Sequence, residues 1–271
     1  MNWRIPLFLL FTVAPWDLFS LPFILPQDEL WKRIDDGLFL SEFTSQNISL
    51  IKIDPKYYSF KLLCASEKNR LRMTARQWCQ KHNIISAINA GMFQADGITN
   101  VGYMKNFNHI NSPRLNTRYK AVLAFNPVDA TVPEIQIIDL KCHDFEKLKD
   151  KYQTLIQGIR MTSCHQENVW EKQDKIWNIA AIGIDKGGNG LFMFTESRYS
   201  VHDFTNILLS LPVSLYNAMY LEGGPEATLY FSVKGVEFEK IGSHETDFNA
   251  NGFPKIARPL PNVIGIVKKS R

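Results

Sequence analysis

The sequence contains no run of charges of one sign, and its 31 Lys and Arg residues exceed its 27 Asp and Glu residues by only four. So small and diffuse an excess argues against a nucleic-acid partner. Long apolar runs are also missing, because Pro15, Asp17 and Pro22 interrupt the stretch that a spanning helix of roughly 20 apolar residues would need. There is no repeat, low-complexity tract or long linker. The 271 residues, 45% of them hydrophobic, therefore predict one large domain or two small ones with ample material for a core.

Cysteine is scarce as well. The four cysteines are Cys64, Cys79, Cys142 and Cys164. They fit either two disulfides in an oxidising compartment, with three pairings open, or four free thiols. The Cys-His pairs at 142–143 and 164–165 match no zinc spacing, which argues against a zinc site. A cysteine hydrolase built on Cys164 and His165 lacks an orienting motif, and sequence neighbours do not easily form a dyad.

The N-terminus is typical of an export signal. Arg4 supplies a positive charge, and an apolar stretch of signal-peptide length runs from residue 5 to residue 14. We therefore predict a signal peptide over residues 1–20, with cleavage near Ser20. Because Leu18 stands where a small residue is preferred, an uncleaved N-terminal anchor is the alternative. The protein is expected to be exported, periplasmic or secreted, and to touch a membrane only through this segment.

The remaining pattern predicts more strands than helices. Strands are expected at residues 48–53, 58–64, 84–89, 121–125 and 135–138, with a hairpin at 179–184 and 190–195 around a Gly-rich loop. Helices are expected at 74–82, 144–152 and 201–211, the first beginning after an N-cap-like Thr74. This order indicates an α+β fold, with a mixed, largely antiparallel twisted β-sheet core and flanking helices in a single domain.

One loop combines two carboxylates, two glycines and a proline between apolar segments that resemble strands. It reads Glu222-Gly223-Gly224-Pro225-Glu226. The glycines allow a close backbone approach to a ligand, and two acids so near in sequence can converge on one pocket. An ordinary turn with solvated glutamates is the competing interpretation.

Two further segments carry polar groups beside buried strands. Asn89 ends an apolar run and is followed by Ala90 and Gly91, which either presents an amide at a pocket or caps a turn. Arg258 and Asn262 lie on an extended, proline-rich approach to the last strand. The planar guanidinium of Arg258 suits phosphate oxygens, although a surface ion pair is the more common role of a lone arginine.

These segments, in this order, resemble the motifs of the phosphodiester glycosidase family. The matching stretches are 89–93, 181–185, 221–230 and 258–266, and the likeness extends over a domain at residues 31–268. The resemblance implies hydrolysis of a sugar 1-phosphodiester, at the bond from the anomeric carbon to the phosphate oxygen, in a cell-envelope or exopolysaccharide glycan. The partner would then be a phosphate-linked carbohydrate.

The resemblance also assigns roles. Glu222 becomes the base or nucleophile, Glu226 its partner or a ligand of a sugar hydroxyl, and Asn89 a third catalytic residue. The expected substrate- and phosphate-binding residues are Arg258, Asn262, Gly91, Gly223, Gly224 and Arg160. A phosphate leaving group needs less acid assistance than an alcohol, so the site mainly requires donors for phosphate and a carboxylate for the sugar. No cofactor is required, but a divalent cation such as calcium, held by Glu222, Glu226 and Asp185, stays an alternative.

Two departures from the family pattern bear on activity. Glu222 stands where the family usually has Asp, which displaces the carboxylate by on the order of an ångström. Trp177 stands where an arginine is common, so either Arg160 takes over its role in substrate binding or the specificity differs. The Asn-rich loop at 103–119 is predicted to be a substrate lid or a solvated surface loop. A non-catalytic, glycan-binding member of the same fold that assists polysaccharide assembly or export is the second hypothesis.

Overall fold

The computed structural model describes residues 30–243 and 256–270, so the predicted signal segment lies outside the described residues. Sixteen strands dominate these residues, and the helices are few and short. The protein is therefore mainly β, and the predicted α+β class fits only loosely, whereas the antiparallel core in a single domain-like unit is confirmed. No helix within the described ranges is long and apolar enough to cross a membrane.

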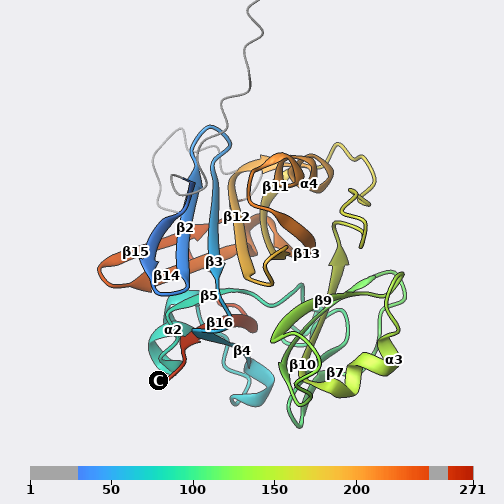
Figure 1. Cartoon of the computed structure of the whole chain (residues 1–271). Coiled ribbons are helices and arrows are strands. Elements are labelled where there is room, and N and C mark those ends of the chain that lie inside the picture. Colours follow the sequence, from blue (N-terminus) through green and yellow to red (C-terminus); the bar gives the residue numbers. More distant parts are fainter. Residues whose placement is uncertain (1–29, 244–255, 271) are drawn as a thin grey trace, which may run out of the picture.

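The strands form two antiparallel sheets (Figure 1). The larger, eleven-stranded sheet has the order β1 (Lys32–Asp35), β2 (Leu38–Phe43), β3 (Ile48–Ile53), β12 (Gly190–Tyr199), β11 (Trp177–Asp185), β13 (Leu215–Gly223), β10 (Tyr152–Arg160), β6 (Met104–Asn106) and β7 (His109–Ser112), with β8 (Ala121–Pro127) on β10 and β9 (Ile135–Asp139) on β8. The smaller sheet has the order β15 (Val236–Ile241), β14 (Thr228–Val233), β5 (Ser86–Asn89), β16 (Asn262–Lys268) and β4 (Tyr58–Cys64).

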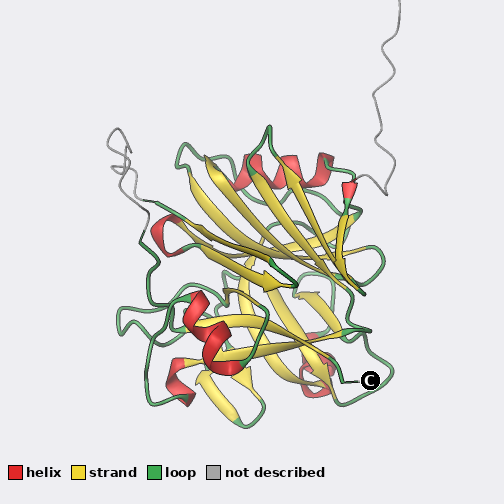
Figure 2. Cartoon of the chain, turned by 90° about the vertical axis from the view of Figure 1, so that its left-hand side faces the viewer, coloured by secondary structure: helices red, strands yellow, loops and turns green. Residues whose placement is uncertain are grey.

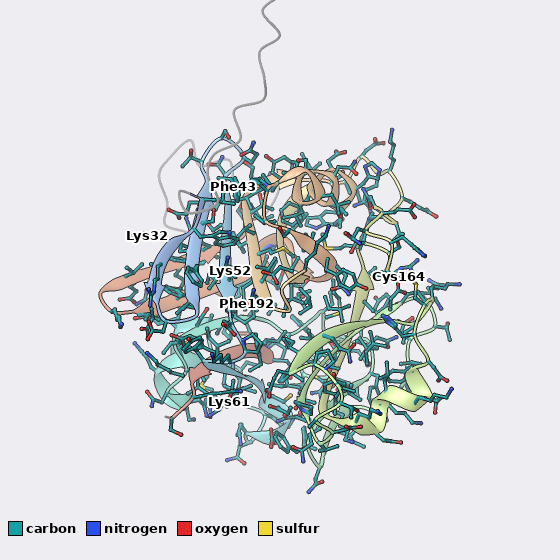
Figure 3. The ribbon with its side chains drawn as sticks, in the orientation of Figure 1. Lys32, Phe43, Lys52, Lys61, Cys164 and Phe192 are labelled. Atoms are coloured by element: carbon teal, nitrogen blue, oxygen red, sulfur yellow. A yellow bond between two sulfur atoms is a disulfide. The ribbon has the colours of Figure 1, made fainter. Side chains whose placement is uncertain are left out.

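The main core lies between the two sheets. Phe192 from the large sheet (labelled in Figure 3) lies in this core. Its ring packs edge-on against that of Phe60 from the small sheet, with ring centroids 6.2 Å apart. Alternate residues of β12 point to this interior, namely Phe192 and Phe194, whereas Leu191 and Met193 are buried in a second cluster on the opposite face of the sheet. Burial of one such aromatic side chain contributes roughly 2–3 kcal/mol.

Two helices cover the outer faces of the sheets (Figure 2). Helix α4 (Val201–Ser210) packs Phe204 and Leu208 on the large sheet, and helix α2 (Ala75–His82) packs Trp78 on the small sheet. Helix α2 begins with a capping box, in which the Thr74 side chain accepts from the Gln77 amide and the Gln77 side chain accepts from the Thr74 amide. The helices predicted at 74–82 and 201–211 are confirmed.

The segment at 103–119 and β10 depart from the expectations. The loop contains the β6–β7 hairpin, and β10 was not predicted as a strand. The helix expected at 144–152 is shorter: α3 (Phe145–Leu148) continues into a 3₁₀ turn, η2 (Lys149–Lys151). Two further 3₁₀ turns are η1 (Ala65–Glu67) and η3 (Gly224–Glu226). The sequence around β6, β7 and β10 is rich in polar residues, which hides the apolar alternation on which strand prediction depends.

Candidate active site

The loop with the two glutamates carries the chain from one sheet to the other. Strand β13 of the large sheet ends at Gly223, η3 follows, and β14 enters the small sheet. Strand β13 has one extra residue here, since Ala180 of β11 lies opposite Glu222 and Ala181 opposite Tyr220, which leaves Leu221 without a direct partner. Such a bulge bends a strand and re-aims the following side chain, and bulges are common beside active sites.

Glu222 is partly buried and carries the most distinctive carboxyl of this region. Its pKa is raised to about 8, mainly by burial and also by the charge of Glu226, while a hydrogen bond from the Gly223 amide (3.0 Å) opposes the shift. In turn, the charge of Glu222 adds to the effect of burial in raising the pKa of the Tyr119 and Tyr220 hydroxyls. Glu222 is therefore mostly protonated at pH 7, and two tyrosines lie within its electrostatic reach.

Glu226 has a different environment from Glu222, although it lies only four residues away. Its carboxylate accepts a 2.6 Å hydrogen bond from Arg258 Nη1, which forms an ion pair with it. Arg258 is held there because Leu260, two residues on, pairs with the Met73 backbone and accepts from the Trp78 indole (3.0 Å). The loop thus offers one neutral carboxyl and one charge-compensated carboxylate.

Asn89 fixes the shape of this loop. At the end of β5 and 2% exposed, its amide donates to the Glu226 carbonyl (2.9 Å) and accepts from the Thr228 amide (2.8 Å). Both ends of the side chain are therefore committed to the backbone. The structure gives Asn89 the geometry of a positioning residue, which differs from the catalytic role that the motif suggested.

Asn262 and Gly91 support the same corner of the small sheet. The Asn262 side chain donates to the Ile98 carbonyl (3.0 Å), and its backbone carbonyl accepts from Ala90. Gly91 has a φ of +133°, and a Cβ at this position would lie 2.7 Å from Oδ1 of the buried Asn100. Only glycine fits this conformation and this space without strain. Both residues stabilise the backbone that supports the site.

Arg160 lies beside the buried Asp139 instead of standing free for substrate. Its Nη1 contacts both Asp139 carboxylate oxygens at 2.8 Å, and the Cys164 amide donates to the same carboxylate (3.1 Å). Cys142 and Cys164 form a disulfide at this point. That bond rules out a Cys164 nucleophile, and it occupies the sulfurs of the Asp139, Cys142 and Cys164 cluster, the candidate metal ligands among the described residues.

The two other cysteines, Cys64 and Cys79, are buried free thiols. Burial raises the pKa of Cys79 to about 12 and that of Cys64 still higher, so neither is a thiolate near neutral pH. Asp185 lies at the far end of β11 from Ala180, the partner of Glu222, and its carboxylate accepts from the Gly187 and Asn189 amides. The structure therefore does not bring Asp185 together with the two glutamates as ligands of one cation.

Gln157 is a site residue that motif reading missed. It is fully buried in β10, donates to the carbonyls of Asn116 (2.8 Å) and Tyr119 (2.9 Å), and accepts from the amides of Tyr103 and Asn116. This single side chain ties the end of the 103–119 loop to the sheet and places Tyr119 near Glu222. The sequence signal that could have identified Gln157 is its position directly after the apolar pair Leu155 and Ile156.

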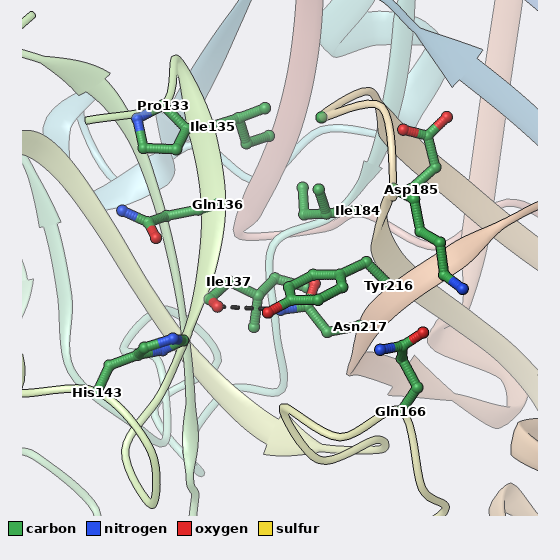
Figure 4. A pocket seen from close by; sticks show the side chains of 12 residues that line it. Pro133, Ile135, Gln136, Ile137, His143, Gln166, Ile184, Asp185, Tyr216 and Asn217 are labelled. Carbon is green, nitrogen blue, oxygen red and sulfur yellow. Dashed lines mark hydrogen bonds between the residues drawn. The ribbon is translucent and has the colours of Figure 1, made fainter. Parts of the chain in front are cut away.

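A large cavity lies away from these residues. It measures about 570 Å³ and is lined by Ile137, Tyr216 and Asn217, among others, at the opposite end of β13 from Glu222 (Figure 4). Asn217 donates to the Ile137 carbonyl (3.1 Å). Of the motif stretches only 181–185 reaches this cavity, through Ile184 and Asp185, and neither glutamate of the loop lines it, so its size does not make it the candidate active site.

Comparisons with known proteins agree with the motifs. The family model of phosphodiester glycosidases matches residues 82–267. A crystal structure of a hypothetical protein from Synechocystis is similar in fold, with a TM-score of 0.59, 12% identity, and coverage of 88% of this chain and 61% of the other. The catalytic domain of zebrafish N-acetylglucosamine-1-phosphodiester alpha-N-acetylglucosaminidase, auto-inhibited by its pro-peptide, gives a TM-score of 0.57 at 13% identity, over 88% of this chain and 82% of that domain. A search of curated protein sequences gives no match.

The fold and the loop geometry define a mainly β protein with a two-glutamate loop between its sheets. The match covers more than half of the chain, so the protein belongs to the phosphodiester glycosidase family. At 12–13% identity the two solved structures establish the fold alone, and the chain spans about three fifths of the Synechocystis structure.

Proposed function

We propose that the protein hydrolyses the bond between the anomeric carbon of a sugar and a phosphodiester oxygen, in a cell-envelope or exopolysaccharide glycan. The observation that carries the proposal is the pair of unlike carboxyls in the loop between the sheets. Glu222 has a pKa of about 8, and Glu226 is paired with Arg258. Two carboxyl groups kept in different protonation states are the usual arrangement for acid and base roles in glycoside hydrolysis.

Charge balance explains why this pairing suits an anionic substrate. A phosphodiester carries a negative charge, and two ionised carboxylates would repel it. A protonated Glu222 removes one of these charges and offers an O–H donor to the phosphate, and Arg258 offsets the charge of Glu226. The loop can thus receive phosphate while it still holds a carboxylate near the sugar.

The pKa of Glu222 favours a division of labour opposite to the one that the motif suggested. In this proposal Glu222 donates its proton or a hydrogen bond to the departing phosphate oxygen. Glu226 stabilises positive charge at the anomeric carbon or activates water. Asn89 and Gln157 hold the loop and Tyr119 in place, through hydrogen bonds to backbone groups.

A non-catalytic, glycan-binding member of the fold is the second candidate, and the replacement of the family Asp by Glu222 favours it. One experiment separates the two. The purified protein is incubated with a nucleotide sugar and with a p-nitrophenyl phosphosugar, beside Glu222→Gln, Glu226→Gln and, as a matched control, the exposed Glu146→Gln. We expect turnover by the parent and the control, with losses of at least a hundredfold in the two loop variants. Equal turnover by all four, or glycan binding without turnover by the parent, refutes catalysis at this loop.

Export is part of the proposal. The Cys142–Cys164 disulfide supports it, because disulfides persist mainly in oxidising compartments. N-terminal sequencing of the protein from fractionated cells tests it. A mature protein outside the cytoplasm that begins near residue 21 is the expected result, and a full-length cytoplasmic protein with free thiols contradicts it.

A further inference from the structure

A second cavity, of about 390 Å³, is lined in part by residues that contact Tyr220, two positions before Glu222 on β13. It is lined by Arg118, Lys120, Ile159, Arg160, Val169, Trp170, Glu171, Lys172 and Gln173. Trp170 packs against Tyr220 with ring centroids 5.4 Å apart, and Ile159 of β10 pairs with Tyr220 of β13. The cavity therefore adjoins the strand end that carries Glu222.

Four of the nine residues that line it are cations. Arg160 is neutralised by Asp139, but within the described residues no ion pair involves Arg118, Lys120 or Lys172. Lys120 instead donates to the Thr117 carbonyl. These three positive charges face a single acid in the lining, Glu171. The cavity thus has an excess of positive charge, which attracts an anion from solution.

The neutral lining adds a donor and an apolar wall. The side-chain amide nitrogen of Gln173 is buried and has no hydrogen-bond partner, although a buried donor is normally satisfied. Trp170 supplies the wall. Arginine forks and lysine ammonium groups are the usual ligands of phosphate oxygens.

The position of the cavity links it to the active site. Arg118 and Lys120 flank Tyr119, whose hydroxyl lies within electrostatic reach of Glu222 and whose carbonyl is held by Gln157. A substrate whose scissile phosphodiester lies at Glu222 would therefore extend toward this cavity past Tyr119, because Tyr220 is buried. Within the part of the chain that the structure describes, three unpaired cations against the single acid Glu171 leave a net charge of two in the cavity lining. One singly charged phosphodiester would balance only one of these charges.

We propose that the cavity between Trp170 and the Arg118–Lys120 segment binds a second phosphate group of the substrate, beyond the phosphodiester that is cleaved. The inference rests on the proposed function and narrows it to substrates with at least two phosphates on the leaving-group side. Two sources provide this chemistry: the diphosphate of a nucleotide sugar, and the next phosphate of a polymer with repeating phosphodiesters.

The first test measures binding of an anion and does not depend on catalysis. Inorganic pyrophosphate is titrated into the full-length protein at low salt by calorimetry, with an Arg118→Gln/Lys120→Gln double variant beside it. The control is Arg114→Gln, an exposed arginine of the same loop that does not line the cavity. We expect the double variant to weaken binding at least tenfold and the control to change it less than twofold. Equal weakening in both, or no binding by the parent, overturns the proposal.

The second test compares KM for three substrates: the methyl phosphodiester of a sugar 1-phosphate, a nucleoside diphosphate sugar, and an oligomer with repeating phosphodiesters. A lower KM for the diphosphate or for the oligomer identifies the source, and the double variant should abolish that advantage while kcat stays within about twofold. An advantage that survives in the double variant refutes the second phosphate site. Pyrophosphate binding without any turnover would instead refute the proposed function and leave the anion site standing.

Discussion

The unusual pKa of Glu222 makes a prediction that requires no substrate: Glu222→Gln should stabilise the protein at alkaline pH. The folded-state pKa is about 8, above the ordinary value of 4.5, so the folded protein binds the proton more tightly than the unfolded chain. Stability from this group is fully present below pH 4.5 and is lost as the pH rises toward 8. Glutamine resembles the protonated carboxyl and does not titrate, so the variant escapes this loss.

The magnitude follows from the shift. The difference between about 8 and 4.5 is about 3.5 pKa units, which at about 1.4 kcal/mol per unit corresponds to about 5 kcal/mol as an upper bound. Glu222 is partly exposed, and solvent screening reduces the effect. We therefore expect the Gln variant to gain roughly 2–3 kcal/mol over the parent at pH 8.5 and to differ little from it at pH 5.

Urea unfolding at half-unit steps from pH 5 to pH 9, without reducing agent, measures this difference. The exposed Glu146→Gln is the control, and its difference from the parent should not change with pH in this way. A Glu222→Gln difference that is constant with pH, or that favours the parent at pH 8.5, shows that Glu222 ionises normally. It would remove the basis for treating this residue as the acid.

Three further predictions follow from contacts of the same region. Glu226→Gln removes a charge that raises the pKa of Glu222, so the alkaline limb of kcat/KM should move to lower pH; an unmoved limb shows that the two groups are not coupled. Cys142→Ser with Cys164→Ser opens a loop closed over 22 residues and should lower the free energy of unfolding by roughly 2–4 kcal/mol in non-reducing urea titrations, and no change refutes a stabilising disulfide. Asn89→Ala leaves the Glu226 carbonyl and the Thr228 amide without partners and should cost roughly 1–3 kcal/mol by the same measurement, whereas a neutral effect refutes its positioning role.

The sequence predicts elements well where apolar alternation is strong. The strands at 48–53 and 58–64 have the predicted bounds, because β3 and β4 are rich in apolar residues with partial alternation and a turn at Asp54 and Pro55 separates them. Strand β10 escaped prediction because a functional polar residue, Gln157, lies within it. The helices are fewer and shorter than the α+β prediction required, so the protein is mainly β.

The convergence of the motifs was predictable, but their electrostatics were not. Order along the chain indicated that Asn89, Glu226 and Arg258 belong together, and the structure confirms that Glu226 contacts both of the others. The partner of Arg160 could not be read from the sequence, since Asp139 lies 21 residues away and meets it only through the pairing of β8, β9 and β10. The pKa of Glu222 likewise depends on tertiary burial, which no local pattern encodes.

The central claim, cleavage at the anomeric carbon, is tested most directly by hydrolysis of a sugar 1-phosphodiester in ¹⁸O-labelled water. Attack at carbon places the label on the released sugar, and attack at phosphorus places it on the phosphate. The proposed chemistry predicts ¹⁸O in the anomeric hydroxyl of the sugar and unlabelled phosphomonoester, with turnover lost in Glu222→Gln. Label in the phosphate, or release that persists in Glu222→Gln, would contradict it.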